Sequence, residues 1–284
     1  MTKRELDSAV RVHRSVSAVR LEDGVATFVA EEIAEEVPVA LVYNGVPHVV
    51  VMATPANLED LALGFSLSEG VIESAAEIGG LEIVPEQTGC SIYLSVPQER
   101  VAEIEQRRRN MTARTGCGIC GAQTIEQAMR EVPRVAFART FSSVAVAAAM
   151  KQLPRLQVLN AATGAVHAAG WANADGELQI VREDVGRHNA LDKLIGALVS
   201  QGIDRTQGFI VVTSRASYEM VQKAAMAGVG LLVAVSAPTA LAVRVARGAA
   251  LTLAGFARGE RCVVYADDAN RLTAKANWSE GAKS

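Results

Sequence analysis

The sequence predicts an α+β N-terminal domain over residues 1–138, followed by a three-layer α/β C-terminal domain over residues 139–284. The chain has 284 residues, half of them hydrophobic, which is enough for a sizeable core and favours two modest domains over one. Strand-like runs in the first half come as a hairpin pattern. In the second half they alternate with helical patterns, as in a domain with a largely parallel central sheet.

The first strands are predicted from a turn signal. Residues up to about Arg20 show little pattern and predict at most one edge strand. The dipeptide Asn44-Gly45 then joins two β-rich runs, Val37–Tyr43 and Val46–Ala53. Asn-Gly between two such runs is a strong hairpin signal, so we expect an antiparallel pair here.

A helix is predicted next, because apolar residues then recur at helical spacing. Asn57 is its expected N-cap, Asp60 completes an approximate capping box, and the helix should end near Gly70. The rest of this half is predicted to hold strands around Leu81–Val84 and Ser91–Val96 and a polar helix over Gln98–Arg109.

The second half begins with a predicted helix, Ser142–Leu153, capped by Ser142 or Ser143 and ended by Pro154. The remaining elements should be a strand pair around Asp175-Gly176 (His167–Asn173, Glu177–Val181), helices Arg187–Ser200, Ser217–Ala227 and Thr239–Arg247, strands Phe209–Thr213 and Leu231–Val235, and short strands near Leu251 and Val263.

Composition excludes several classes of partner. The net charge is -3 and charges of both signs are mixed, so neither a nucleic acid nor a membrane is expected as a partner. The first residues lack the apolar core of a secretory signal, which predicts a cytoplasmic protein. The apolar stretch 228–257 contains a proline and arginines and so predicts buried strands and helices. The four cysteines are expected to be reduced in that compartment.

The motif richest in chemistry is Cys117-Gly118-Ile119-Cys120, within a glycine-rich segment over residues 110–122. The segment has no periodicity and predicts a loop, the kind of segment that often holds functional residues. The thiolate is the reactive form of cysteine, and cations or a helix N-terminus lower its pKa. Arg114 and the run Arg107–Arg109 lie upstream, and a predicted helix starts at Gln123.

Several interpretations of a single CxxC remain open. Half of a zinc site would need a second ligand pair, whereas Cys90 and Cys262 are single and distant, and their strand patterns indicate inert thiols. A thioredoxin-like dithiol should follow a strand and open a helix, which this segment does not. Buried small residues are disfavoured by the flanking glycines. The remaining interpretation is a nucleophilic cysteine that accepts sulfur and holds it as a persulfide.

The chain also resembles a known family, the formate dehydrogenase accessory sulfurtransferases. The similarity covers essentially the whole chain beyond the first few residues. It rests on five segments in order: LALGFSLSEG (61–70), RTGCGICG (114–121), REDVGRHNALDKLIG (182–196), TSRASYEMVQKAA (213–225) and GFARGER (255–261).

The resemblance implies a function. Members of this family take sulfur from a cysteine desulfurase and transfer it to the bis-molybdopterin guanine dinucleotide form of the molybdenum cofactor, which is destined for formate dehydrogenase. Cys117 matches the cysteine that holds the persulfide, and Cys120 matches its partner. A guanine nucleotide segment is implied at Phe256, Ala257, Arg258, Gly259, Glu260 and Arg261, where an aromatic ring can stack on a base and arginines can pair with phosphate.

The family's C-terminal domain is similar to the cytidine deaminase fold. Zinc deaminases need H-x-E and P-C-x-x-C at two helix starts, where this chain has His188-Asn189-Ala190 and Ser214-Arg215-Ala216-Ser217. We therefore expect no bound metal and no deaminase activity. The same pocket is predicted to bind the guanine nucleotide portion through His188, Asn189, Lys193, Ser214, Arg215 and Ser217, since helix N-termini suit phosphate.

Simpler interpretations stand beside these. His188 fits a helix start bonded to a carboxylate, Asp184 fits a helix cap, and residues 256–261 fit a surface turn. The arginine run Arg107–Arg109 fits either a solvated face or a docking site for an acidic partner. A homodimer is expected, because the cofactor has two guanine nucleotide ends and a two-fold dimer would match them.

Overall fold

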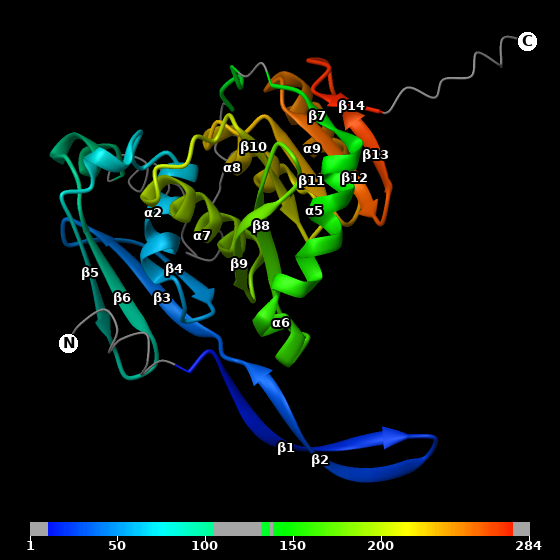
Figure 1. The fold of residues 1–284 in the computed structure, drawn as a ribbon. Helices are drawn as coiled ribbons and strands as arrows, with labels where there is room; N and C mark the ends of the chain where they lie inside the picture. The colour runs from blue at the N-terminus through cyan, green and yellow to red at the C-terminus, as the bar shows by residue number, and fades with distance from the viewer. Residues whose placement is uncertain (1–10, 105–131, 137–138, 275–284) are drawn as a thin grey trace, which may run out of the picture.

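A computed structural model describes residues 11–104, 132–136 and 139–274 of the chain. Within these residues the strands form a four-stranded sheet, a six-stranded sheet and two pairs (Figure 1). The smaller sheet has the order β4-β3-β6-β5, with β3 at Val37–Tyr43, β4 at Val46–Ala53, β5 at Gly80–Pro85 and β6 at Cys90–Ser95. The predicted Asn44-Gly45 hairpin is confirmed, since both residues have positive φ, 46° and 81°.

Helix α2, Leu58–Ser68, packs on the inner face of this sheet and ends before Gly70, as predicted. Asn57 is the N-cap, but it adopts the left-handed conformation and its side chain makes no capping hydrogen bond. The predicted capping box is therefore wrong. Asp60 instead accepts a hydrogen bond from Arg182 Nε at 2.8 Å, because α2 packs against the second half of the chain. Residues 98–104 are helical, and the rest of the predicted polar helix lies outside the described residues.

A long hairpin precedes these elements where we expected at most one edge strand. β1, His13–Glu22, pairs with β2, Val25–Ala34, over their whole length. The turn residues Asp23 and Gly24 have φ of 50° and 80°, as a two-residue hairpin turn requires. Asp-Gly between apolar runs was the available signal in the sequence. We call this hairpin the arm, because it extends away from the body of the molecule (Figure 1).

The six-stranded sheet has the order β13-β12-β11-β10-β8-β9. Its strands are β8 His167–Asn173, β9 Leu178–Asp184, β10 Gly208–Val212, β11 Leu231–Ala234, β12 Thr252–Arg258 and β13 Arg261–Ala266. Only the pairs β10–β11 and β11–β12 are parallel, so the expectation of a largely parallel sheet is wrong. Consecutive strands β8–β9 and β12–β13 are joined by short turns, which force antiparallel pairing.

Helices cover both faces of this sheet. α5, Ser143–Leu156, packs on one face, where Phe209, Val211 and Val233 point. The opposite face, with Ile210 and Leu232, packs against three helices, since alternate strand residues point to opposite faces. These helices are α7 Arg187–Ser200, α8 Tyr218–Met226 and α9 Ala240–Gly248. Helix, sheet and helices thus form three layers.

Helix α5 begins where the sequence predicts, because Ser142 Oγ caps the amide of Ala145 at 3.0 Å. It does not end at Pro154, which lies inside the helix, two residues before its last residue. A proline so near the end removes one backbone hydrogen bond without stopping the last turn. The short elements that follow or flank α5 are α6 Val158–Thr163, β7 Phe141–Ser142 and β14 Leu272–Thr273, and a 3-10 turn, η1, spans Ala75–Glu77.

Helices α2 and α7 cross at very close range and join the two sheets. A Cβ atom built on Gly64 would lie 1.7 Å from the carbonyl oxygen of Asp192, and one built on Gly196 would lie 1.9 Å from that of Asp60. Only glycine fits at both positions. One continuous hydrophobic core therefore runs from the four-stranded sheet to the six-stranded sheet. The domain division at residue 138 and the likeness to cytidine deaminases stay predictions.

Candidate carboxyl-edge binding site

The predicted nucleotide residues follow strands that run in one direction. β9 and β10 are both antiparallel to β8, and β11 and β12 are parallel to β10. The carboxyl ends of these four strands therefore meet at one edge of the sheet, which is where ligands bind in open α/β sheets. We call this region the carboxyl edge. It comprises residues 185–188, 213–217, 235–239 and 256–261.

Hydrogen bonds hold the loops of the carboxyl edge together. The amide of Thr239 donates to the carbonyl of Ala216 at 3.0 Å, and the amide of Phe256 donates to the carbonyl of Ser236 at 3.2 Å. The loops after β10 and β11 and the last residues of β12 are thus bonded in succession. The two segments that the sequence singled out separately, residues 213–217 and 256–261, consequently lie on one connected surface.

His188 lies in the first turn of α7 and faces α8. Its Nε2 atom is 2.9 Å from Oε2 of Glu219, but the ring nitrogen is not aligned for a hydrogen bond and has no other partner among the described residues. Burial lowers the pKa of His188 and outweighs the opposing effect of Glu219. The imidazole is therefore neutral at pH 7, and its Nε2 atom is buried beside Glu219 without a hydrogen-bond partner in the described chain.

Three residues of the predicted pocket lie just before α8. Ser217 is the N-cap of α8, yet its side chain makes no capping bond, and within the described chain its buried Oγ has no hydrogen-bond partner. Arg215 is exposed, whereas Ser214 is buried and donates its hydroxyl to the carbonyl of Arg215 at 2.9 Å. The exposed guanidinium of Arg215 can thus bind an anion near a helix N-terminus, whereas the unpaired Ser217 Oγ is buried.

The β12–β13 hairpin contributes the aromatic ring of the edge. Phe256 has φ of 49°, unusual for a residue with a bulky side chain, and is 41% exposed where the register of β12 shifts. Arg258 pairs across the turn with Arg261, and both are exposed, as are Gly259 and Glu260. Ala257 is fully buried in the core beneath, so its side chain cannot contact a nucleotide.

Asn189 and Lys193 lie beneath the edge and do not line it. Lys193 is fully buried, and its ammonium donates to Asp184 Oδ2 at 2.5 Å and to the carbonyl of Thr54 at 2.8 Å. Asn189 Nδ2 donates to Met52 O at 2.7 Å and to Asp184 Oδ1 at 3.0 Å. Burial lowers the pKa of Lys193 against the pull of Asp184.

Asp184 is the centre of this network. Besides Lys193 and Asn189, it accepts hydrogen bonds from the backbone amides of Thr54 at 3.0 Å and Gly186 at 2.8 Å. The simple helix-cap interpretation of Asp184 is therefore too narrow. It connects the end of β4 to the turn that positions the start of α7.

A second buried network was not predicted. Lys223 on α8 donates to Asp192 at 2.9 Å, to Glu69 at 2.8 Å and to Ser68 at 3.0 Å, and its ammonium lies 5.3 Å from the centre of the Phe65 ring. Burial alone would lower the pKa of Lys223, but the two carboxylates outweigh it and raise the pKa. Its signal in the sequence was a pair of charged residues, 192 and 193, inside an otherwise apolar stretch of helix.

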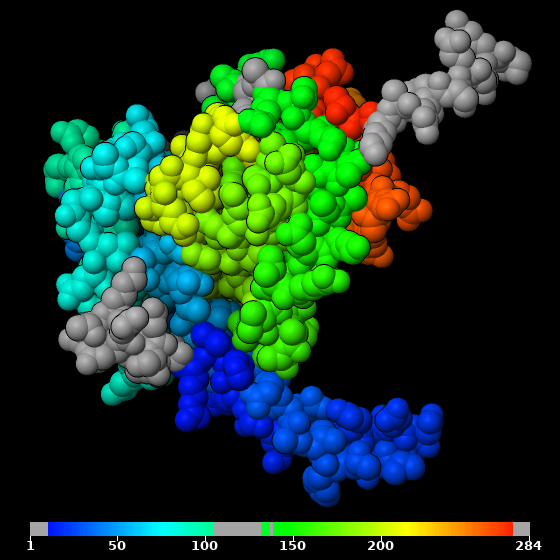
Figure 2. Space-filling model, in the orientation of Figure 1, coloured from blue at the N-terminus to red at the C-terminus, as the bar shows by residue number. Residues whose placement is uncertain are grey.

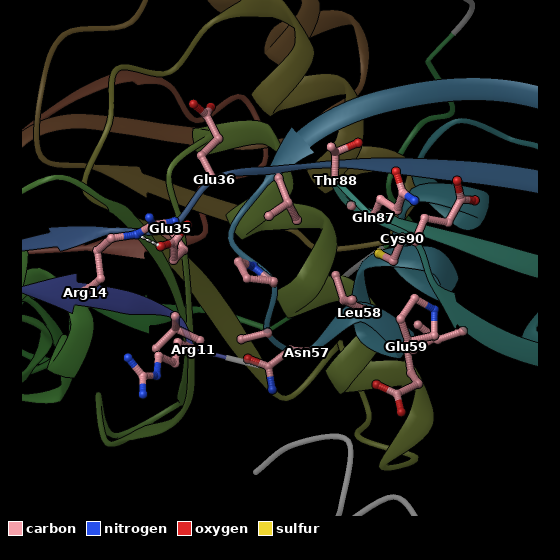
Figure 3. A pocket seen from close by; sticks show the side chains of 18 residues that line it. Arg11, Arg14, Glu35, Glu36, Asn57, Leu58, Glu59, Gln87, Thr88 and Cys90 are labelled. Carbon is pink, nitrogen blue, oxygen red and sulfur yellow. Dashed lines mark hydrogen bonds and ion pairs between the residues drawn. The ribbon is translucent and has the colours of Figure 1, made fainter. Parts of the chain in front are cut away.

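A cavity of about 750 Å³ lies elsewhere, between the base of the arm, the start of α2 and the β5–β6 turn (Figure 3). None of the predicted nucleotide residues lines it. Cys90 does, and burial raises the pKa of its thiol, as it does for Cys262. Both thiols are half-buried and protonated at neutral pH, and their inertness stays a prediction.

Cys117, Cys120 and the arginines before them lie outside the described residues. Within residues 11–104, 132–136 and 139–274, no group of three or more His, Cys, Asp or Glu side chains is placed to bind a metal ion. No helix in the same ranges has the length and apolarity needed to cross a membrane.

The fold and the edge define a mixed α/β protein whose polar residues gather where the parallel strands end. Comparison of the sequence with known families identifies the family of the chain. A model of the FdhD/NarQ family matches residues 34–273, and the chain belongs to this family. Relatives named sulfur carrier protein FdhD are 49% identical in Bordetella petrii (88% of this chain, 90% of the relative) and 51% identical in Cupriavidus necator (92% and 90%).

The fold has a counterpart among solved structures. The crystal structure of a protein from Desulfotalea psychrophila, described as a formate dehydrogenase accessory protein, superposes with a TM-score of 0.72. It is 24% identical in sequence, and the match covers 93% of this chain and all of that one. At this identity the likeness shows that the mixed α/β fold with several sheets is shared.

Proposed function

We propose that this chain is a cytoplasmic sulfur carrier that acts as a sulfurtransferase in the maturation of formate dehydrogenase. The observation that supports this most is the segment RTGCGICG, residues 114–121, inside a family match that spans 34–273. Relatives that share about half of the residues over about nine-tenths of the chain are named sulfur carriers, which supports the same function.

In the proposed reaction Cys117 accepts sulfur without a net change in oxidation state. Its thiolate attacks the outer sulfur of a persulfide on a cysteine desulfurase, a new S–S bond forms, and the desulfurase cysteine leaves as a thiolate. Cys120 assists the second transfer. Its thiolate attacks Cys117, which releases the outer sulfur as sulfide and leaves a Cys117–Cys120 disulfide for a cellular thiol to reduce.

The acceptor of the sulfur is the molybdenum cofactor in its bis-molybdopterin guanine dinucleotide form, bound as a substrate. We propose that the carboxyl edge binds its guanine nucleotide ends. The Phe256 ring stacks on the base, Arg258 and Arg261 pair with phosphate, and the unpaired polar atoms of His188 and Ser217, buried in the free protein, complete the contact. Two such ends favour a homodimer with one edge in each copy.

Within this proposal the predicted pocket residues have two roles. Arg215 and Ser217 contact the nucleotide, together with the exposed hairpin residues. Asn189 and Lys193 act from beneath, because they fix Asp184, and Asp184 fixes the amide of Gly186 at the start of α7. The protein itself holds no metal in this proposal; the molybdenum arrives and leaves with the cofactor.

Intact-protein mass spectrometry tests the sulfur step. The full chain is incubated with a cysteine desulfurase and cysteine, and wild type is compared with Cys117→Ala and Cys120→Ala. We expect wild type to gain one sulfur atom that reductant removes, Cys117→Ala to gain none, and Cys120→Ala to retain the added sulfur. A gain of sulfur on Cys117→Ala, or none on wild type, would contradict the carrier function.

A further inference from the structure

The arm has one apolar face that is open to solvent. Residues paired across the two strands share a face, so Leu21 lies beside Ala26, Val19 beside Phe28, and Ser17 beside Ala30. This face has no charged side chain over that length. The charged pair Arg20–Glu31 lies on the opposite face, at 2.6 Å, and the pair His13–Glu32 closes the apolar face at the base of the arm.

The exposure of these residues is high for a folded protein. Phe28 is 89% exposed, Leu21 76% and Val19 51%. Figure 2 shows the outer part of the arm standing clear of the body, while its base lies against α6. A two-stranded ribbon is at best marginally stable alone in water, and adjoining exposed apolar side chains usually mark an interaction site. The apolar face of the arm therefore has the character of an interaction surface.

Among the residues that the structure describes, the four-stranded sheet has a second face with exposed apolar side chains, which the charged Glu82 borders. Helix α2 packs on the inner face of the four-stranded sheet, whereas Val50, Met52 and Tyr93 point outward and are 62%, 48% and 42% exposed. The pairing of Ala40 with Val50 and of Val42 with Tyr93 places these side chains on one face. We call this surface the outer face.

Surface area decides between a second copy and an unrelated partner. A ten-residue ribbon is ~33 Å long and ~10 Å wide, so one face covers ~330 Å². One arm on one partner would bury ~660 Å² in total, which is below what specific interfaces need. Two arms exchanged between two copies would bury ~1,300 Å², which is within the usual range for a stable complex.

We propose that the apolar face of the arm packs on the outer face of a second copy of this chain, and that the contact is repeated about a two-fold axis. Each copy has both surfaces, as an isologous dimer requires. The apolar residues of the arm form the centre of the contact, and its charged base forms a polar rim. This proposal assigns a contact surface to the homodimer proposed above. It depends on the two protein surfaces and not on the cofactor or on sulfur transfer.

Sedimentation equilibrium of the full chain without cofactor tests this proposal and leaves sulfur transfer out of the measurement. The variants are Phe28→Glu and, as a matched control, Thr27→Glu, the same change one residue away on the other face. We expect wild type and the control to be dimers, and the dissociation constant of Phe28→Glu to rise ~30-fold or more. A monomeric wild type, or a Phe28→Glu dimer as tight as wild type, would overturn the proposal.

Cross-linking identifies the receiving surface. A photoreactive phenylalanine analogue replaces Phe28, and copies labelled with ¹⁵N are mixed with unlabelled copies. We expect cross-linked peptides that contain one isotope each and join residue 28 to β4 or β6. Cross-links within a single copy, or to another part of the second copy, would show that the outer face does not receive the arm.

Discussion

The carboxyl edge and the junction of α2, α7 and α8 both contain polar and charged residues. These residues are paired within the protein at the junction, and several of them lack a partner or are exposed at the edge. At the junction, Lys193 and Lys223 are almost fully buried, and their ammonium groups donate hydrogen bonds to oxygens of the protein. At the edge, Ser217 and His188 have polar atoms without a hydrogen-bond partner in the described chain, and Arg215 is exposed. The sequence had assigned Lys193 and Ser217 to one pocket.

The difference shows that polarity near a helix start does not by itself identify a ligand contact. A buried polar group must be paired, or it costs the desolvation free energy, so paired groups stabilise the fold. Exposed groups at a sheet edge, such as Arg215, contribute little to folding and can bind a ligand. The junction should therefore govern stability and the edge should govern nucleotide affinity, and the predictions below test this separation.

The largest effect is expected at the buried ion pair. Lys193→Met removes the cation from Asp184 and leaves a buried, uncompensated carboxylate. The free energy of unfolding should fall by ~3–5 kcal/mol, as for other broken buried pairs. Urea denaturation followed by circular dichroism measures this.

Two variants control that experiment. Arg215→Met likewise replaces a long cationic side chain by methionine, but at the exposed edge. It should change the free energy of unfolding by less than ~0.5 kcal/mol. The double variant Asp184→Asn with Lys193→Met should regain part of the loss. If Arg215→Met proved as destabilising as Lys193→Met, the separation of the two regions would be wrong.

The helix crossing should come next. Gly64→Ala places a methyl group where the Asp192 carbonyl lies, and backbone cannot move aside without separating α2 from α7. We expect the free energy of unfolding to fall by ~1–3 kcal/mol, although alanine is the better helix former. Gly248→Ala at the end of α9 is the control, because its Cβ would meet nothing within 4 Å. Equal stability of the two variants would argue against the close crossing.

Local signals in the sequence predicted much of the fold. The bounds of α7 and β8 agree with the prediction, and so does the hairpin at Asn44-Gly45, since caps, periodicity and turn residues act over a few neighbours. Errors came where distant contacts decide. Pro154 remains helical, and Asp60 bonds to Arg182, 122 residues away, where a local capping box was expected.

The site was predictable in part for the same reason. Motifs located the helix starts and the 256–261 hairpin, and the strand directions bring them to one edge. Which side chains face out there depends on packing, and the sequence did not separate Lys193 or Ala257 from their exposed neighbours. Charged residues surrounded by apolar ones within a helix, such as Asp192, would have indicated a buried network.

Binding at the edge should respond to Phe256 with little effect on folding. Phe256→Gly removes the stacking ring and suits the positive φ at this position. We expect the affinity for guanosine diphosphate to fall by ~1–3 kcal/mol, the usual range for base stacking on an aromatic ring. The free energy of unfolding should change by less than ~1 kcal/mol.

Isothermal titration calorimetry with guanosine diphosphate measures that affinity. The control is Val144→Ser, which removes an exposed apolar side chain from α5, outside the carboxyl edge. It should leave nucleotide affinity unchanged. If Phe256→Gly bound guanosine diphosphate as tightly as wild type, the ring would have no part in binding, and the edge would need another basis for recognition.

The smallest effect is expected from the titration of His188. Burial lowers its pKa in the folded state below the ordinary value of 6.5, so the unfolded chain binds a proton first as the pH falls. The free energy of unfolding should therefore decline below pH 6.5 and level off once the folded histidine also protonates. Glu219 and Glu69 oppose the shift, while Arg187 and Lys223 reinforce it.

Urea denaturation of wild type and His188→Gln across this pH range isolates the contribution. His167 has a pKa lowered in the same direction by burial and titrates in both proteins, so the difference between the two curves reports His188 alone. We expect the free energy of unfolding of wild type, minus that of His188→Gln, to fall as the pH falls through 6.5 and then to become constant. A difference independent of pH would mean that the ring is as free to protonate in the folded protein as in the unfolded chain, and hence that the edge around it is open to water.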